Sequence, residues 1–382
     1  MLRSLLYLVC FLFIPFGLLS QKWVEDVVNV FETEIGKQKD STHYHTKFVY
    51  SPIISYDPTT SLGFGGGMKF LFKLKDSYEE TRTSNIPISA RYTLKNQFIF
   101  NAEYTIFSNQ ENWMYRGNFG FLNYPIAFYG IGNQSKSSDE VEISYSNFLF
   151  EPIFLKRLKG KLFTGAGLRY NNIYGAEYLE SDLREFDENA DFLEARAIGV
   201  ELALTYDDRS NVLNSTSGWF IEYTLGTYDE RIGSTHNFNL SKLNARTYIQ
   251  LNEAREYDVL AFEFFSRFAW GDVPTLELSS LGGASLLRGT VEGRYRDKNN
   301  FFFQSEYRWQ TFDRIGVVFF GGAGQVFAEQ KELGLDQLKY SLGAGLRLKV
   351  VKAENLNIRF DYGFKFGDEL ENAFYLSLAE AF

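Results

Sequence analysis

"LKYSLGAGLRLKV" (338–350) and "NLNIRFDYGFKF" (355–366) alternate apolar and polar residues with a period of two. That period predicts strands with one apolar and one polar face. The apolar rows run for ten residues or more, and the polar rows set charges such as Arg347 and Asp361 beside glycine. A soluble sandwich also alternates, but long, aromatic apolar rows opposite a crowded polar row are typical of a transmembrane β-barrel.

Similar segments recur along the chain, and their number and spacing predict an all-β, antiparallel barrel of sixteen strands in the bacterial outer membrane. The longest connections, 123–141, 174–193 and 271–298, follow the fifth, seventh and eleventh segments. With the N-terminus in the periplasm, odd-numbered connections face outward, where long loops occur. The predicted strands are 47–56, 61–74, 86–95, 97–107, 111–122, 142–152, 161–173, 194–207, 217–228, 236–251, 256–270, 299–312, 314–327, 338–351, 355–366 and 372–382.

The first 46 residues divide into two short segments ahead of a barrel at 47–382. "MLRSLLYLVCFLFIPFGLLSQ" (1–21) has the pattern of a secretory signal peptide. It contains Cys10, the only cysteine, so the mature chain is expected to have neither disulfides nor thiolate chemistry. Residues 22–46 form a short periplasmic or lumenal segment whose apolar residues predict an amphipathic helix. These apolar residues are Val24, Val28, Phe31 and Ile35.

Composition limits the partners and the fold class. The formal net charge of −9 argues against nucleic acid, which is bound by basic surfaces. Aromatic residues make up 18% of the chain, and 32 glycines stand against seven prolines, which favours strands over helices. No stretch after the signal peptide approaches the roughly 18 apolar residues of a membrane-spanning helix.

The last segment, "NAFYLSLAEAF" (372–382), has an apolar row that ends on an aromatic residue. This pattern resembles the C-terminal signal by which outer-membrane barrels are recognised for insertion. Glu380 interrupts the row, which is tolerable at a membrane interface, where a charge costs little. The alternative is an ordinary edge strand. The candidate signal residues are Phe374, Leu376, Leu378 and Phe382.

The long connection 271–298 contains "LRGT" (287–290), and the strand after it, "FFFQSEYRWQ" (301–310), sets Glu306 on its polar face beside Arg308. The whole stretch resembles the BamA/TamA-type outer-membrane assembly barrels of the bacterial surface antigen superfamily. In that family a sixteen-stranded barrel has a long loop before strand twelve, and the arginine of that loop meets acidic residues on the following strands.

The resemblance implies that Leu287, Arg288, Gly289 and Thr290 lie inside the lumen and that Glu306 is the acidic partner of Arg288, held in a bidentate pair. Leu287 and Thr290 depart from the usual residues of the motif. The family's second acidic partner lies on the next strand, where this chain has glycine, so the resemblance assigns no third residue. A local Glu306–Arg308 pair and a solvated Arg288 remain alternatives.

Two further stretches, "YDDRSNVLNSTSGWFIEY" (206–223) and "FYGIGN" (128–133), are similar to segments of the same family. The resemblance implies protein assembly, insertion or translocation, with outer-membrane lipid and other outer-membrane or periplasmic proteins as partners. Assembly factors of the family carry periplasmic docking repeats, and residues 22–46 are too few for a module of about 50 residues. We therefore expect a short form. A passive small-solute channel and a structural scaffold for a partner protein are the alternatives.

Nothing in the sequence predicts an enzyme, a metal site or a cofactor. His43 and His45 make a weak metal pattern without further ligands nearby. His236 follows Ser234 and Thr235, but no Gly-x-Ser-x-Gly turn occurs. The acidic stretch 177–195 is best explained as a solvated surface loop. We therefore assign no catalytic residue.

Overall fold

The computed structural model describes residues 32–33, 46–57, 61–74, 81–178, 193–212, 214–252, 255, 258–312, 314–351, 356–367, 369–378 and 380–382. The expected signal peptide, nearly all of 22–46 with its expected helix, and most of the acidic stretch 177–195 lie outside these residues. Within them, no helix is long and apolar enough to cross a membrane.

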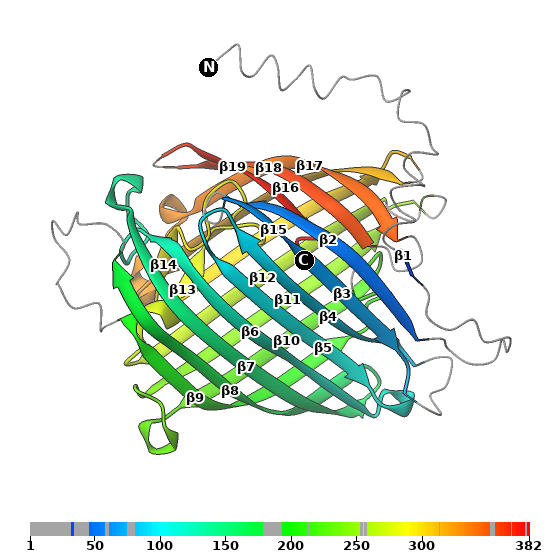
Figure 1. Ribbon diagram of the computed structural model, residues 1–382, viewed down its shortest axis with the longest axis horizontal. Coiled ribbons are helices and arrows are strands. Elements are labelled where there is room, and N and C mark those ends of the chain that lie inside the picture. Colours follow the sequence, from blue (N-terminus) through cyan, green and yellow to red (C-terminus); the bar gives the residue numbers. More distant parts are fainter. Residues whose placement is uncertain are drawn as a thin grey trace, which may run out of the picture.

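In the described part of the chain, sixteen long antiparallel strands follow one another around a barrel (Figure 1). The two-residue β1 (Glu32–Thr33) pairs with the start of β2, and β13 (Ser279–Leu281) forms a separate ribbon with β14 (Tyr295–Asp297). The barrel strands are β2 (Lys47–Asp57), β3 (Ser61–Phe72), β4 (Ser84–Thr93), β5 (Phe98–Phe107), β6 (Trp113–Phe128), β7 (Val141–Lys159), β8 (Leu162–Tyr178), β9 (Ala195–Asp207), β10 (Gly218–Tyr228), β11 (Phe238–Gln250), β12 (Val259–Gly271), β15 (Asn299–Gln310), β16 (Ile315–Phe327), β17 (Lys339–Val351), β18 (Leu356–Phe366) and β19 (Glu371–Leu378).

The first and last barrel strands meet at a junction that we call the seam. Each strand pairs with its successor, β12 pairs with β15, and β19 returns to β2 through one register pair, Leu376 with Tyr56. By contrast, β18 and β19 pair over eight positions, from Lys365–Glu371 to Ile358–Leu378. Among the described residues, the pairing between neighbouring barrel strands is therefore shortest at the seam, where one register pair joins β19 to β2.

The sixteen predicted strands correspond one to one with these strands, but several ends differ. β6, β7 and β8 extend to Phe128, Lys159 and Tyr178, beyond the predicted ends at 122, 152 and 173. These three strands keep pairing with one another past the apolar rows, because a backbone ladder needs no apolar side chain. β19 stops at Leu378, short of the predicted 382.

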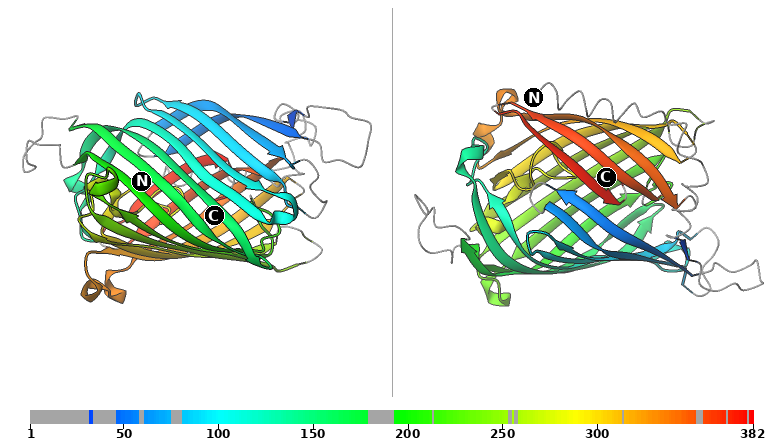
Figure 2. Two further views of the ribbon diagram at one scale, coloured as in Figure 1. Left: turned by 90° about the horizontal axis from the view of Figure 1, so that it is seen from below. Right: turned by 45° about the horizontal axis from the view of Figure 1, so that its top comes forward.

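The strands turn alternate side chains to the lipid and to the lumen. In β9, Val200, Leu202 and Leu204 are exposed on the outer face, whereas Glu201 and Thr205 are buried on the inner face. This arrangement matches the alternation of a transmembrane barrel, in which the polar row faces inward. Short turns such as 108–112, 160–161 and 311–314 lie at the end of the barrel where β1 lies, which we call the short-turn end, and the longer connections 129–140 and 272–298 lie at the other end (Figures 1 and 2).

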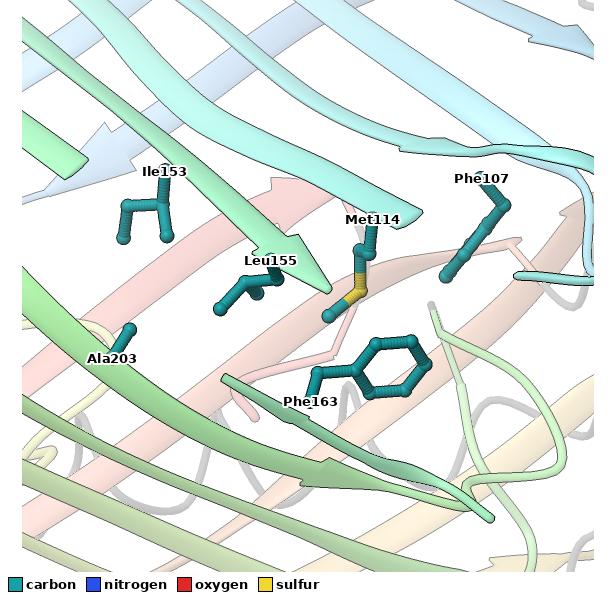
Figure 3. Close-up of a cluster of buried hydrophobic side chains, with 6 residues drawn as sticks. All are labelled: Phe107, Met114, Ile153, Leu155, Phe163 and Ala203. Carbon is teal, nitrogen blue, oxygen red and sulfur yellow. The ribbon is translucent and has the colours of Figure 1, made fainter. Parts of the chain in front are cut away.

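A compact apolar cluster lies inside the barrel, near the short turns (Figure 3). It brings together side chains from neighbouring strands. Two arginines from the turn regions contact its rings. The guanidinium of Arg82 lies 4.4 Å from the Phe107 ring centroid, and that of Arg157 lies 5.5 Å from the Phe163 ring centroid. Its members are Phe107, Met114, Ile153, Leu155, Phe163 and Ala203.

Candidate functional site

The connection between β12 and β15, residues 272–298, folds into the lumen (Figure 2). Its first anchor is Glu277 in the short 3-10 helix η6 (Thr275–Glu277), a buried carboxylate. Glu277 accepts hydrogen bonds from Arg169 Nη1 at 2.9 Å, Arg267 Nη2 at 3.2 Å and Asn171 Nδ2 at 2.5 Å. Strands β8 and β12 thereby hold the beginning of the loop against the inner wall.

The backbone conformation is unusual at Leu287 and Gly289, the two neighbours of Arg288. Leu287 has a φ of 54° and Gly289 a φ of 120°, both in the left-handed region. A Cβ on Gly289 would lie 2.6 Å from the carbonyl carbon of Phe364 on β18, so only glycine fits there. Gly363 on β18 lies on the other side of this contact. A Cβ added to Gly363 would lie 2.7 Å from the Arg288 carbonyl oxygen. The loop and β18 therefore touch backbone to backbone.

Arg288 is 1% exposed and its guanidinium joins two strands. Nη1 donates a hydrogen bond to Asp361 Oδ2 on β18 at 2.8 Å. Nη2 forms an ion pair with Glu306 Oε1 on β15 at 2.6 Å and donates to Gln304 Oε1 at 3.3 Å. The guanidinium carbon lies 3.7 Å from the Phe320 ring centroid, which adds a cation–π contact.

The expected pairing of Arg288 with Glu306 is present, but the expected bidentate geometry is wrong. The two terminal nitrogens are divided between Glu306 and Asp361, because carboxylates approach the guanidinium from two different strands. The sequence predicts no such role for Asp361, because the family's second acidic partner is expected on the next strand, β16, where this chain has glycine. The available signal was its place in the polar row of 355–366, directly beside Arg359 in the same row.

Each of the two carboxylates also binds a second arginine. Glu306 accepts a hydrogen bond from Arg308 Nε at 2.9 Å, so the local pair coexists with the loop contact. Asp361 accepts from Arg347 Nη1 at 2.6 Å, and Arg347 Nε donates to Glu380 at 2.6 Å. All these side chains are buried, and removing one member leaves an uncompensated charge in a poorly solvated lumen. The network therefore fixes the loop to β15, β17 and β18 together.

Beyond Arg288 the loop is attached to β19. Tyr375 donates its hydroxyl proton to the Thr290 carbonyl at 2.5 Å, while the Gly289 N–H donates to the Tyr375 hydroxyl at 3.1 Å. The Thr290 hydroxyl donates to Glu371, and Arg294 Nε donates to the same carboxylate at 3.0 Å. The departure from the family motif at Thr290 thus contributes a contact to the last strand of the barrel.

The four residues of the candidate C-terminal signal do not share one environment. Phe374 is exposed on the lipid face, and Leu376 is partly buried where it pairs with Tyr56 at the seam. The side chain of Leu378 lies outside the described residues. Phe382, at 7% exposure, points into the lumen. The expectation of one shared apolar face is therefore wrong at Phe382, because the chain leaves the sheet after β19.

Residues 380–382 lie inside the lumen and contact residues of β11, β12 and β15 there. Arg308 Nη2 donates to the Phe382 carbonyl at 2.9 Å. Glu380, expected at the membrane interface, is instead buried and accepts from Arg347 and from Asn357 Nδ2 at 2.6 Å. The Phe382 ring packs in an apolar cluster with Tyr248, Val259 and Ala261.

The stretch 206–223 forms the β9–β10 turn at the short-turn end. Asp207 accepts hydrogen bonds from Arg209 Nε and from Arg82 Nη1, both at 2.9 Å. The Asp-x-Arg pattern therefore organises a turn and also fastens it to the segment ahead of β4.

The stretch 128–133 ends β6 at the opposite end of the barrel and meets the lumenal loop. The Gly132 N–H donates to the Arg296 carbonyl at 2.7 Å. Asn133 Nδ2 donates to the Gln337 carbonyl at 2.7 Å, so this segment links two outer connections.

Within the described residues, no group of three His, Cys, Asp or Glu side chains is placed to hold a metal ion. His236 Nδ1 lies 2.8 Å from the Thr235 hydroxyl and its Nε2 lies 4.0 Å from Asp272. His43 and His45 lie outside the described residues.

Comparisons with known proteins agree with this architecture. The family model of the Omp85 superfamily domain matches residues 63–382. Among solved structures, BamA from Haemophilus ducreyi lacking POTRA domains 1–3 aligns with a TM-score of 0.58 at 13% identity, covering 93% of this chain and 76% of that one. CdiB from Escherichia coli aligns with a TM-score of 0.59 at 11% identity, covering 92% and 67%.

CdiB from Acinetobacter baumannii aligns with a TM-score of 0.55 at 11% identity, covering 88% of this chain but only 60% of that one, which is less than two thirds. A search of curated protein sequences finds no match. At these identities the solved structures establish the fold alone, whereas the family model spans most of the sequence. The chain belongs to the Omp85 superfamily and is an outer-membrane β-barrel with the fold of BamA and CdiB.

Proposed function

We propose that this barrel acts in the assembly, insertion or translocation of proteins at the outer membrane. The observation that carries the proposal is the seam, where β19 and β2 share one register pair, Leu376–Tyr56, within the part of the chain that the structure describes. A membrane barrel normally pairs every strand edge, because unsatisfied backbone groups are costly in hydrocarbon. An edge with free backbone groups can accept an added strand from another polypeptide.

The asymmetry between the two sides of the seam supports the same function. β19 is held by β18 and by the lumenal loop, through Tyr375 and Glu371. β2 pairs with β3 over eleven positions. Opening of the seam would therefore separate β2 from a last strand that β18 and the lumenal loop both hold in place.

A passive channel is the principal alternative, and the lumen content argues against a wide pore. The loop 272–298 and its ion pairs occupy one side of the lumen. A cavity of about 430 Å³ lies toward the short turns and is lined by charges of both signs, and another of about 1250 Å³ lies between the outer connections 129–140 and 328–338. A lumen that a loop and its ion pairs partly fill predicts small conductance rather than a steady large pore.

A disulfide across the seam tests the proposal. In a Cys10→Ser background, Tyr56→Cys with Leu376→Cys places two cysteines at the seam pair. Tyr362→Cys with Phe374→Cys is the matched control, because it crosslinks β19 to β18 on the same face. The purified protein is reconstituted in vesicles, and insertion of an unfolded outer-membrane barrel is measured by its acquired protease resistance.

We expect oxidation of the seam variant to abolish the acceleration of insertion and a reductant to restore it, with the control active in both states. A seam variant equally active when oxidised would contradict the role of the seam. Large, steady conductance that oxidation leaves unchanged would favour the channel. A partner protein that co-purifies with the barrel, without any insertion activity, would favour the scaffold.

A further inference from the structure

One periplasmic turn differs in charge from its neighbours. The β7–β8 hairpin carries "KRLKGK" (156–161), four cations and no acid within six residues of a chain whose net charge is −9. The adjacent β5–β6 turn (108–112) and β9–β10 turn (208–217) each contain an acid, as does the β15–β16 turn (311–314). The hairpin is therefore a local basic surface on an acidic protein.

Two of the four cations are neutralised inside the turn cluster. Arg157 Nη2 and Lys161 Nζ each lie 3.1 Å from Glu111 Oε2, a buried carboxylate that also binds Arg82. These contacts hold the β7–β8 hairpin against the β5–β6 turn. Their positive charge is consequently matched within the protein.

The other two cations face outward. Lys156 and Lys159 are exposed, and within the described residues no carboxylate pairs with either of them. Lys156 lies opposite Trp113 in the strand register, and its Nζ lies 5.6 Å from the Trp113 ring centroid. Trp113 in turn stacks on Tyr115 with ring centroids 6.4 Å apart. The exposed ammonium of Lys156 therefore lies beside a pair of stacked aromatic rings.

The neighbours of Lys156 locate it at the membrane boundary. Phe154 and Leu158 precede and follow it in the outward row of β7, and they are 52% and 59% exposed. Exposed aromatic residues at a strand end mark the interface between lipid chains and water. A lysine in this row can lay its stem along the apolar side chains and place its ammonium at the level of the headgroups.

We propose that Lys156 and Lys159, together with the Trp113 ring, bind the phosphate groups of anionic phospholipids in the periplasm-facing leaflet. The chemistry recognised is a lipid phosphodiester with a net negative charge, seated where Trp113 contacts the upper acyl chain. Each lysine near a charged membrane surface strengthens lipid association about fivefold. The surface would fix the level of the β7–β8 hairpin in the bilayer, and it is independent of any insertion activity.

Quenching of Trp113 fluorescence tests this surface. The protein is reconstituted in phosphatidylcholine vesicles containing a minor fraction of phosphatidylglycerol, with brominated acyl chains on one lipid or the other. The difference between the parent and Trp113→Phe isolates the signal of Trp113. We expect brominated phosphatidylglycerol to quench Trp113 several-fold more than brominated phosphatidylcholine at equal fraction.

Lys156→Gln with Lys159→Gln should lose most of this preference, whereas Lys156→Arg with Lys159→Arg should keep it. Lys95→Gln with Lys331→Gln is the matched control, since it removes two exposed lysines from the opposite end of the barrel and should keep the preference. Heat-modifiable electrophoretic mobility checks that each variant is folded. Added sodium chloride should weaken the preference of the parent, because salt screens exposed charges.

Equal quenching by the two lipids in the parent would overturn the proposal, and so would a preference that survives in the double glutamine variant. Competition by inorganic phosphate tests whether the lysines bind a free anion instead of a lipid. If it cancels the preference more strongly than chloride at equal ionic strength, the lysines form a site for a free anion rather than for a lipid. A loss of preference in the control pair would likewise overturn the assignment to this hairpin.

Discussion

Arg288 Nη1 lies 2.8 Å from Asp361 Oδ2, and this ion pair connects the lumenal loop to the strand that precedes the last one. The same guanidinium contacts Glu306, so the loop is fixed by two carboxylates that are 55 residues apart in the sequence, at positions 306 and 361. This division of one arginine between two strands has a direct consequence for charge exchange.

Exchanging Arg288 and Glu306 should fail to restore the barrel. In the double variant Arg288→Glu, Glu306→Arg, the new glutamate faces Asp361 and the new arginine lies beside Arg308. Both contacts are repulsive, and breaking a buried ion pair costs about 3–5 kcal/mol. We expect the single and double variants alike to lower the temperature at which heat-modifiable mobility changes.

The matched control is Arg231→Glu, because Arg231 is 88% exposed in an outer turn and pairs with Asp229. That variant should behave like the parent, since exposed pairs contribute little. Full recovery in the double variant of the preceding test would instead show that Asp361 does not share the arginine.

Gly289→Ala should be far more damaging than Gly130→Ala. Both glycines have positive φ, so each substitution carries a left-handed strain of about 1–2 kcal/mol. A Cβ at Gly130 meets nothing within 4 Å, whereas at Gly289 it would lie 2.6 Å from the Phe364 carbonyl carbon. The added overpacking should cost about 1–3 kcal/mol more. Thermal unfolding of the two purified variants measures the difference, and equal losses would place Gly289 away from β18.

The fold was predictable because lipid and lumen impose a period of two on the sequence. In β17 and β18 the apolar rows alternate with Arg347, Arg359 and Asp361, and that alternation identified the strands. The ends of β6 to β8 were harder, because the ladders continue where the apolar row stops. Backbone pairing leaves no side-chain signature there.

The candidate site was only half predictable. The loop motif and the strand that follows it predict Arg288 and Glu306. Asp361 belongs to a strand 55 residues further on, and its contact depends on how the loop crosses the lumen, which no local pattern records. The sequence also does not predict that Phe382 points into the lumen. If β19 continued to residue 382, Phe382 would lie on the lipid face with Phe374, whereas it packs in a lumenal cluster.

Acid should loosen the cluster of short turns through Glu111. Burial opposes ionisation of this carboxyl group, but the Arg82 guanidinium overcomes it and lowers the pKa of Glu111 below its ordinary value near 4.5. Since the pKa is lowered in the folded state, the stabilisation is complete above the ordinary value. It is lost as the pH falls from there through the lowered pKa. Unfolding temperatures at neutral pH and at about pH 3 should therefore differ more for the parent than for Glu111→Gln.

Asp229→Asn is the control for this pH dependence. Hydrogen bonds from Arg231 lower the pKa of Asp229 to about 2, so that it stays ionised over most of the same window. The acid-induced drop should persist in this variant. A drop of full size in Glu111→Gln would assign the acid sensitivity to other carboxylates.

Phe382→Ala separates a lumenal packing role from a recognition signal. The ring is buried in a cluster with Tyr248 and Val259, and truncating a packed phenylalanine costs about 3–5 kcal/mol. We expect the assembled variant to unfold at a lower temperature, with Phe382→Leu closer to the parent because it keeps most of the apolar contact. Phe374→Ala, on the exposed lipid face, should change the unfolding temperature less. If Phe382 served insertion alone, Phe382→Ala would lower the amount of assembled barrel while the assembled fraction unfolded at the parent temperature.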